Sequence, residues 1–217
     1  MNYHYIAIEG NIGVGKSTLA NLLAQHYNSR LVLEEFADNN FLPKFYQDVE
    51  RYAFPLELSF LADRFKQLKQ FASNHDLFQE TVISDYILTK SKLFARVNLK
   101  DQEYELFQRL FDITATNLPS PDLLIYLHAP VNKLMQNIRQ RGRTYEQSIT
   151  AEYLERVQQV YQQYIKQEIQ KTLIIDTSSF DFVNEPENFS RLLQFLDKDY
   201  DFNVHYLNIE DYQLKSH

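Results

Sequence analysis

The residues with the clearest chemical meaning form a glycine-rich segment close to the start of the sequence. From Gly10 to Ser17 the chain matches the pattern G-x-x-x-x-G-K-[ST], with a short apolar run before it and a helical pattern after it. In such a loop, backbone N–H groups can surround phosphate oxygens, Lys16 can reach the outer phosphates, and the Ser17 hydroxyl can bind Mg²⁺. The predicted nucleotide-binding residues are Gly10, Asn11, Ile12, Gly13, Val14, Gly15, Lys16, Ser17 and Thr18. The segment predicts a site for a nucleoside triphosphate and Mg²⁺, and it leaves the phosphate acceptor open.

Glycine usage points to a second segment. The chain has only 4 glycines in 217 residues, whereas average usage of about 7% would give roughly 15. Three of them lie in the phosphate loop, and the fourth, Gly142, lies between Arg141 and Arg143. Arginines on a hinge can fold over a triphosphate and neutralise the charge of the transferring group. We therefore expect a short lid at about residues 139–150, with Arg141, Arg143 and Lys16 as catalytic cations.

Carboxylates at the ends of predicted strands indicate the kind of acceptor. Glu34 follows the apolar run 29–33, and Asp85 follows the run 77–84. A phosphorylated acceptor needs cations around it, whereas an uncharged hydroxyl needs a nearby base for its proton. Glu34 is therefore the candidate base in an acidic acceptor pocket, and Asp85 joins Ser17 as a candidate metal ligand. The pattern favours an alcohol as acceptor.

The elements that must position these residues alternate between strand and helix. Strands are predicted at 5–8, 29–33, 77–84, 123–127 and 173–175, and helices at 16–27, 55–73, 89–117, 131–140 and 151–171. The alternation predicts an α/β fold of the phosphate-loop type, a five-stranded parallel sheet flanked by helices, in one domain over residues 1–217. The carboxyl ends of the strands share one edge, where ligands bind in such sheets. The tail after Phe195, about 197–217, is expected to form a last helix with a mobile end, or an interface segment.

Composition excludes several other classes. Lys and Arg number 22 against 29 Asp and Glu, a net charge of -7, so no cationic surface is expected for nucleic acid. No stretch reaches the roughly 18 apolar residues of a membrane helix. Cysteine is absent, which excludes disulfides and thiolate metal sites and fits a cytoplasmic location. We expect neither nucleic acid nor membrane as a partner.

Three blocks of the sequence, residues 9–18, 46–52 and 141–147, resemble the deoxynucleoside kinases, a family that includes deoxycytidine, deoxyguanosine and deoxyadenosine kinases. The resemblance runs from about Tyr5 to Asp176. It implies a five-stranded parallel sheet, ATP with Mg²⁺ as donor, a deoxynucleoside 5'-hydroxyl as acceptor, and a homodimer. The implied role is nucleotide salvage.

The resemblance also implies roles for single residues. Glu34 falls at the family's catalytic base, and Arg141 and Arg143 at its lid arginines. Tyr46 and Glu146 match the pair that binds the sugar 3'-hydroxyl; a phenol and a carboxylate can hold one hydroxyl from two sides.

Two positions depart from the family pattern. Tyr86 replaces the arginine that usually follows the acidic residue, and the segment from there to Phe94 is one residue shorter than usual. Asn137 stands where an earlier lid arginine is common.

The helix from Pro55 carries the candidate base-reading residues. Glu57 occupies a position where glutamine is common, and Arg64 follows seven residues later. A carboxylate can accept from guanine N1–H and N2–H, while Arg64 or Lys90 can donate to O6 or N7, and Phe94 can stack on the base. This favours a purine deoxynucleoside, deoxyguanosine before deoxyadenosine. The alternative is that Glu57 and Arg64 pair with each other on a helix surface.

Two other functions share the phosphate loop. A thymidylate-type nucleoside monophosphate kinase would need a cationic acceptor pocket, and Glu34 and Glu146 oppose it because carboxylates repel a phosphate. A non-catalytic nucleotide-binding regulatory module is suggested by Tyr86 in place of arginine.

Overall fold

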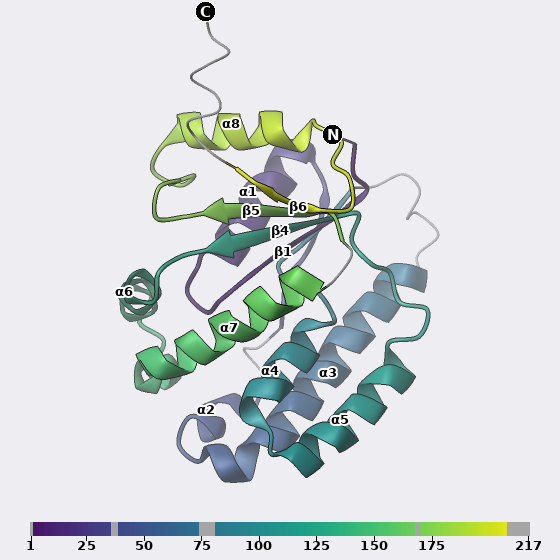
Figure 1. Cartoon of the computed structure of the whole chain (residues 1–217), viewed down its shortest axis with the longest axis vertical. Helices are drawn as coiled ribbons and strands as arrows, with labels where there is room; N and C mark the ends of the chain where they lie inside the picture. Colours follow the sequence, from purple (N-terminus) through teal and green to yellow (C-terminus); the bar gives the residue numbers. More distant parts are fainter. Residues whose placement is uncertain (1, 36–38, 74–80, 168–169, 208–217) are drawn as a thin grey trace, which may run out of the picture.

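The centre of the molecule is a parallel sheet, seen in a computed structural model that describes residues 2–35, 39–73, 81–167 and 170–207 (Figure 1). Within these residues the sheet has six strands in the order β2-β3-β1-β4-β5-β6, and every neighbouring pair is parallel. The strands are β1 (Tyr5–Gly10), β2 (Arg30–Val32), β3 (Val82–Ser84), β4 (Leu123–His128), β5 (Thr172–Asp176) and β6 (Val204–Tyr206).

Helices cover both faces of the sheet (Figure 1). They are α1 (Lys16–Tyr27), α2 (Leu42–Phe45), α3 (Val49–Ser73), α4 (Lys90–Asn98), α5 (Asp101–Thr114), α6 (Val131–Arg141), α7 (Ala151–Gln167) and α8 (Pro186–Leu196), with a 3-10 helix, η2, at Thr144–Ser148. Side chains alternate along β1: Ile6 and Ile8 pack with α1, α6 and α8, while Ala7 packs with α3. Strand β1 is buried along its whole length, and its sequence is apolar from Tyr5 to Ile8. The buried carboxylate of Glu9 accepts from the Tyr161 hydroxyl and from the backbone N–H of Ile87.

The structure corrects several boundaries. The sheet has a sixth strand, β6, in the tail where a helix was expected, and the last helix, α8, precedes that tail. The predicted helix 89–117 is two helices, because Leu99 is extended (φ -98°, ψ 149°) and Lys100 caps α5. Helix α3 starts at Val49 and continues through Pro55. The predictions for residues 77–80, 168–169 and 208–217 lie outside the described residues.

The topology brings the candidate site together at one edge. The phosphate loop follows β1, Glu34 lies two residues after β2, and Asp85 directly follows β3. Because β2, β3 and β1 are parallel neighbours, these three segments meet at the carboxyl end of the sheet. No helix in the described part of the chain is long and apolar enough to span a membrane.

Candidate active site

The phosphate loop is fixed by backbone geometry that requires glycine. Gly10 and Gly13 have φ angles of +147° and +84°, which other residues rarely adopt. A Cβ on Gly10 would lie 2.5 Å from the carbonyl oxygen of Leu127, and one on Gly13 would lie 3.0 Å from that of Leu134. Strand β4 and helix α6 therefore press directly against the loop and hold its shape.

Lys16 is folded over the loop that it follows. Its Nζ donates to the carbonyl oxygens of Gly10 at 2.9 Å and Asn11 at 3.0 Å. Burial, and then the nearby charge of Lys90, lowers the pKa of Lys16 to about 8. These carbonyl bonds are ones that a phosphate could replace, since an anion is a stronger partner for an ammonium group. The side chain of Asn11 donates to the carbonyl of Leu154 at 2.8 Å and accepts from the backbone N–H of Ile12, within the loop, at 2.8 Å.

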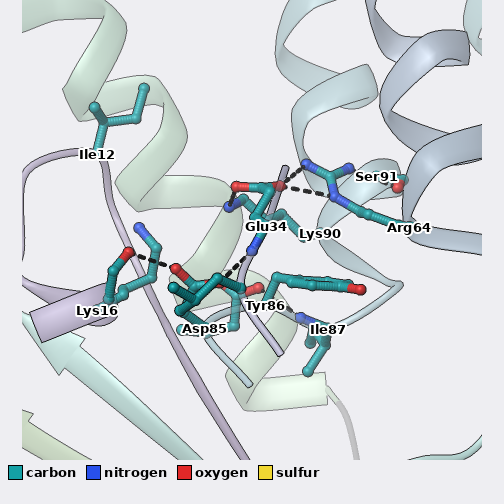
Figure 2. A network of polar contacts seen from close by, with 12 residues as sticks. Ile12, Lys16, Glu34, Arg64, Asp85, Tyr86, Ile87, Lys90 and Ser91 are labelled. Carbon is teal, nitrogen blue, oxygen red and sulfur yellow. Dashed lines mark hydrogen bonds and ion pairs between the residues drawn. The ribbon is translucent and has the colours of Figure 1, made fainter. Parts of the chain in front are cut away.

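Asp85 joins the phosphate loop to the end of β2. One of its carboxylate oxygens accepts from the backbone N–H of Glu34 at 2.7 Å (Figure 2). The other accepts from the Ser17 hydroxyl. A carboxylate beside a hydroxyl offers the oxygen ligands that Mg²⁺ prefers, with phosphates and waters filling its other positions. The donor set of Asp85 and Ser17 therefore fits the ion predicted from the sequence.

Glu34 lies between two cations, Arg64 and Lys90 (Figure 2). Arg64 donates to one oxygen through Nε at 2.9 Å and Nη2 at 2.5 Å, and Lys90 donates to the other at 2.5 Å. Burial alone would raise the pKa of Glu34, but the charges of Lys90 and Arg64 lower it to about 2. Glu34 is therefore a carboxylate at any neutral pH.

Glu57 lies on α3, with 1% of its surface exposed. Its Oε1 accepts from the side-chain amide of Asn98 at 2.7 Å. Its Oε2 is buried and has no hydrogen-bond partner within the described residues. Burial raises the pKa of Glu57 to about 7, against the lowering effect of the Asn98 bond. A buried polar atom left without a partner is costly, which marks this oxygen as a candidate ligand contact.

The lid arginines hold Glu146 in this structure. Arg141 donates to Glu146 Oε2 at 3.0 and 2.5 Å, and Arg143 to Oε1 at 3.2 Å. Gly142 links the two arginines with a φ of +71° at the end of α6. The ring of Tyr46 stacks on Tyr145, with centroids 6.4 Å apart. Asn137, at the departure from the family pattern, donates to the carbonyl of Gly13 at 2.8 Å and so ties α6 to the phosphate loop.

One cavity brings together most of the residues predicted from the sequence. Its lining includes Ile12, Gly13, Lys16, Ser17, Glu34, Tyr46, Glu57, Arg64, Asp85, Lys90, Phe94, Arg141, Arg143 and Glu146. A second groove, on the outer side of the loop, is lined by residues 13–18 and by 177, 178 and 180–184. Arg141 and Arg143 line both, so they stand between the two spaces.

Three residues that line this cavity, Phe60, Asn98 and Tyr153, are not among the site residues predicted from the sequence. Asn98 is one helical turn after Phe94 on the same face of α4, a spacing that could have signalled it. Tyr153 is on α7, far along the chain from Glu57 and Asn98, and no pattern near it in the sequence indicates that it lines the cavity.

Two electrostatic expectations need correction. The cavity is not acidic overall, because its carboxylates Glu34 and Glu146 are each paired with two cations. Its charge therefore does not by itself exclude a phosphorylated acceptor. The surface pair of Glu57 and Arg64 is also not seen: both side chains are buried, and the guanidinium donates to Glu34 and Ser91.

A parallel sheet with this loop at its carboxyl edge, two adjoining ligand spaces and arginines between them defines a phosphate-loop phosphotransferase. The family model of the deoxynucleoside kinases matches residues 6–200. The chain belongs to the deoxynucleoside kinase family and is a kinase.

Similar proteins agree with this assignment. The chain is 36% identical over 195 residues to the deoxyguanosine kinase of Bacillus subtilis (strain 168), covering 87% of this chain and 93% of that one. It is 32% identical to the deoxyadenosine/deoxycytidine kinase of the same organism, covering 74% of this chain and 76% of that one. Among solved structures, deoxyadenosine kinase from M. mycoides with bound dATP is similar in fold, with a TM-score of 0.78 and 24% identity, covering 89% of this chain and 100% of that one.

Proposed function

We propose that this kinase transfers the γ-phosphoryl group of ATP to the 5'-hydroxyl of a purine deoxynucleoside, deoxyguanosine before deoxyadenosine, in nucleotide salvage. The observation that carries this proposal is that one cavity is lined by two carboxyl groups with different surroundings, Glu34 and Glu57. Ionised Glu34 binds Asp85 through its backbone N–H beside the phosphate loop, and we assign this part of the cavity, the reaction end, to the hydroxyl that reacts. Glu57, with one carboxyl oxygen unpartnered within the described residues, lines the same cavity two helical turns before Arg64 on α3, and we assign this part, the base end, to the nucleobase. The likeness to a deoxyguanosine kinase supports the choice of base.

At the reaction end, Glu34 orients the 5'-hydroxyl and accepts its proton. Because Glu34 stays ionised at neutral pH, it needs no prior deprotonation. Three of its roughly four lone-pair sites are occupied, and the one left on Oε2 can accept the substrate O–H while Arg64 and Lys90 stay bound. In a loose transition state for phosphoryl transfer the proton moves late, so even a weak base suffices. We assign Glu34 the role of base and positioning group together.

On the donor side, the loop N–H groups and Lys16 bind the β- and γ-phosphates. Ser17 and Asp85 would hold Mg²⁺, which supplies positive charge to the phosphates when bound. Arg141 and Arg143 line both spaces, and we assign them to the charge of the transferring group. For this they must leave Glu146, which then becomes available, with Tyr46, to hold the sugar 3'-hydroxyl.

At the base end, Glu57 accepts from guanine N1–H and N2–H. Arg64 uses three of its N–H groups on Glu34 and Ser91, and Lys90 uses one on Glu34, so both retain donors for guanine O6 or N7. The ring of Phe94 lines the cavity with the Lys90 ammonium 5.7 Å from its centre, and we assign it to stacking on the base.

The deciding experiment measures ADP release from ATP and Mg²⁺ with each of the four natural deoxynucleosides, with their monophosphates, and with no acceptor. We expect turnover with deoxyguanosine, less with deoxyadenosine, and little with deoxycytidine or thymidine. Preferred use of a monophosphate would instead support the thymidylate-type kinase, and absence of acceptor-dependent turnover the regulatory module. Equal or better use of a pyrimidine deoxynucleoside would contradict the choice of base.

We further propose that residues 1–217 form one kinase domain, with its lid at about 139–150, and that it works as a cytoplasmic homodimer binding neither nucleic acid nor membrane. The acidic net charge of -7 supports the lack of nucleic-acid binding. Light scattering on the purified protein measures the oligomeric state, and a mass of one chain, 25.9 kDa, would contradict the dimer.

A further inference from the structure

The carboxyl group of Glu57 has one oxygen committed and one oxygen open. Asn98 donates to Oε1 at 2.7 Å, and Oε2 is buried with no partner within the described residues. Since Oε1 already accepts an N–H, a proton bound by this carboxyl group belongs on Oε2. The side chain can therefore present either a bare acceptor or an O–H donor at the same point of the cavity.

These two forms match different purine edges. Guanine presents donors at N1–H and N2–H, which a carboxylate satisfies through Oε2 and the second lone pair of Oε1. Adenine in the same position presents an acceptor at N1, which needs an O–H at Oε2, and its C2–H takes the place of guanine N2–H beside Oε1. Each wrong combination leaves a buried donor or acceptor without a partner, so each form rejects the other base.

We propose that Glu57 selects both purines, binding guanine as the carboxylate and adenine as the carboxylic acid, so that the base preference of the enzyme changes with pH. This inference rests on the proposed deoxynucleoside kinase function and adds to it a reason why one cavity accepts two purines.

The groups that face Glu57 allow both forms. Arg64 on α3 and Lys90 on α4 favour the carboxylate, while Glu34 and burial favour the acid, and these opposing effects hold the pKa of Glu57 at about 7. Tyr153 on α7 contributes a phenol whose pKa is raised, so it stays neutral. Glu34, with a pKa of about 2, keeps its charge throughout the neutral range. Glu57 is thus the group at the base end that changes charge near pH 7.

The expected effect has a simple form. If guanine binds only the carboxylate and adenine only the acid, the ratio of kcat/KM for deoxyguanosine to that for deoxyadenosine rises about tenfold per pH unit. Ionisations that affect the chemical step, such as that of Lys16, alter both substrates alike and cancel from the ratio. The slope is therefore a signature of Glu57 that a merely structural role would not produce.

The test uses the full chain and measures kcat/KM for both purine deoxynucleosides at several values between about pH 6 and pH 8. We expect the ratio to rise by about a hundredfold in the wild type, or by at least tenfold if discrimination is incomplete. In Glu57→Gln, whose amide offers a fixed donor and acceptor, we expect a ratio independent of pH and shifted towards deoxyadenosine.

Three results would overturn the inference. A flat ratio in an active wild-type enzyme would reject it and leave the proposed function intact. A slope that persists in Glu57→Gln would move the titration to another group. Absence of activity on any deoxynucleoside would reject the proposed function, and this inference with it.

Discussion

Each end of the cavity holds one glutamate, and the surroundings shift the pKa values of these two carboxyl groups in opposite directions. At the reaction end, Glu34 accepts three hydrogen bonds from two cations and has a pKa of about 2. At the base end, Glu57 accepts one from a neutral amide and has a pKa of about 7. Glu57 is 1% exposed and the Glu34 side chain is 14% exposed, so both are largely shielded from water and burial alone does not decide the charge. The number of cations in direct contact decides it.

This contrast separates the roles that the two residues can take. A carboxylate fixed by cations keeps one charge state and one orientation, which suits a group that must hold a reacting hydroxyl in every turnover. A carboxyl with an open oxygen and a pKa near neutrality suits recognition of a ligand that supplies the missing partner. Two titratable groups whose pKa values are shifted in opposite directions often have different roles in an active site.

The largest expected effect is on the reaction end. Glu34→Gln removes the proton acceptor, so we expect kcat for deoxyguanosine to fall by about a hundredfold or more, with a much smaller change in KM. Glu35→Gln is the matched control, because Glu35 is the exposed neighbour in the chain and should leave kcat unchanged.

Glu34→Gln also leaves Arg64 and Lys90 without their carboxylate, so its unfolding must be measured beside its kinetics. The destabilisation expected from breaking such a buried pair is about 3 kcal/mol or more. If the folded variant kept its turnover, the role of base would have to move elsewhere in the cavity.

The second effect is on stability at the base end. The pKa of Glu57 is raised on folding, from 4.5 to about 7. The contribution of this group to the free energy of unfolding is fully present below about pH 4.5 and is lost as pH rises through about 7. The reason is that the unfolded chain releases this proton near pH 4.5, whereas the folded protein keeps it until about pH 7. Urea unfolding of Glu57→Gln and wild type at about pH 5 and pH 8 should show the variant gaining up to about 3 kcal/mol relative to wild type at the higher pH. Parallel pH dependence in the two proteins would contradict the raised pKa.

The same contrast decides what the sequence could predict. The phosphate loop was predictable residue by residue, because its geometry is local: glycines at positive φ between a strand and a helix. Glu34, Glu57 and Arg64 were predictable as candidates but not as partners. Arg64 lies seven residues from Glu57 on α3, yet it binds Glu34, thirty positions away, because the strand end of β2 packs against that helix.

Other features were hidden for physical reasons. Strand β6 has only three residues, Val204–Tyr206, at the sheet edge, so it carries no apolar run long enough to distinguish it from a loop. The charge of the acceptor pocket was mispredicted because composition reveals carboxylates but not the cations that fold against them. Tyr153 enters the site through the packing of α7, which no pattern near it encodes.

A smaller effect tests the one bond that holds Glu57. The hydrogen bond from Asn98 to Oε1 lowers the pKa of Glu57. Asn98→Ala removes this bond, so the pKa of Glu57 should rise further. A hydrogen bond to a charged group is worth about 1.5 kcal/mol or more, and we therefore expect the purine selectivity curve to move up by about one pH unit without changing its slope. Gln102→Ala, at an exposed position on α5, is the control. An unshifted curve would show that Asn98 does not set the acidity of Glu57.

The smallest predicted effect concerns how the reaction end is held from behind. Tyr86 stands where the family resemblance would place an arginine. Its hydroxyl donates to Gln67 at 2.6 Å, and Gln67 donates to the carbonyl of Leu33, the residue before Glu34, at 3.2 Å. Tyr86→Phe leaves the Gln67 oxygen without this donor, and we expect a loss of about 1 kcal/mol in stability and about a three- to fivefold fall in kcat at nearly constant KM.

Tyr5→Phe provides the comparison that separates positioning from packing. Tyr5 lies in the same buried cluster as Tyr86, and its hydroxyl bonds Ser84 at 3.2 Å, while Ser84 keeps its own bond to the carbonyl of Tyr86. A similar loss of stability with unchanged kcat is expected for Tyr5→Phe. Equal losses of kcat in the two variants would reduce Tyr86 to a core residue. A selective loss of kcat in Tyr86→Phe would mean that the hydrogen bonds from Tyr86 to Gln67 and from Gln67 to Leu33 help to position Glu34, in addition to its two cations. The tyrosine at position 86 would then have a positioning role of its own in place of the arginine.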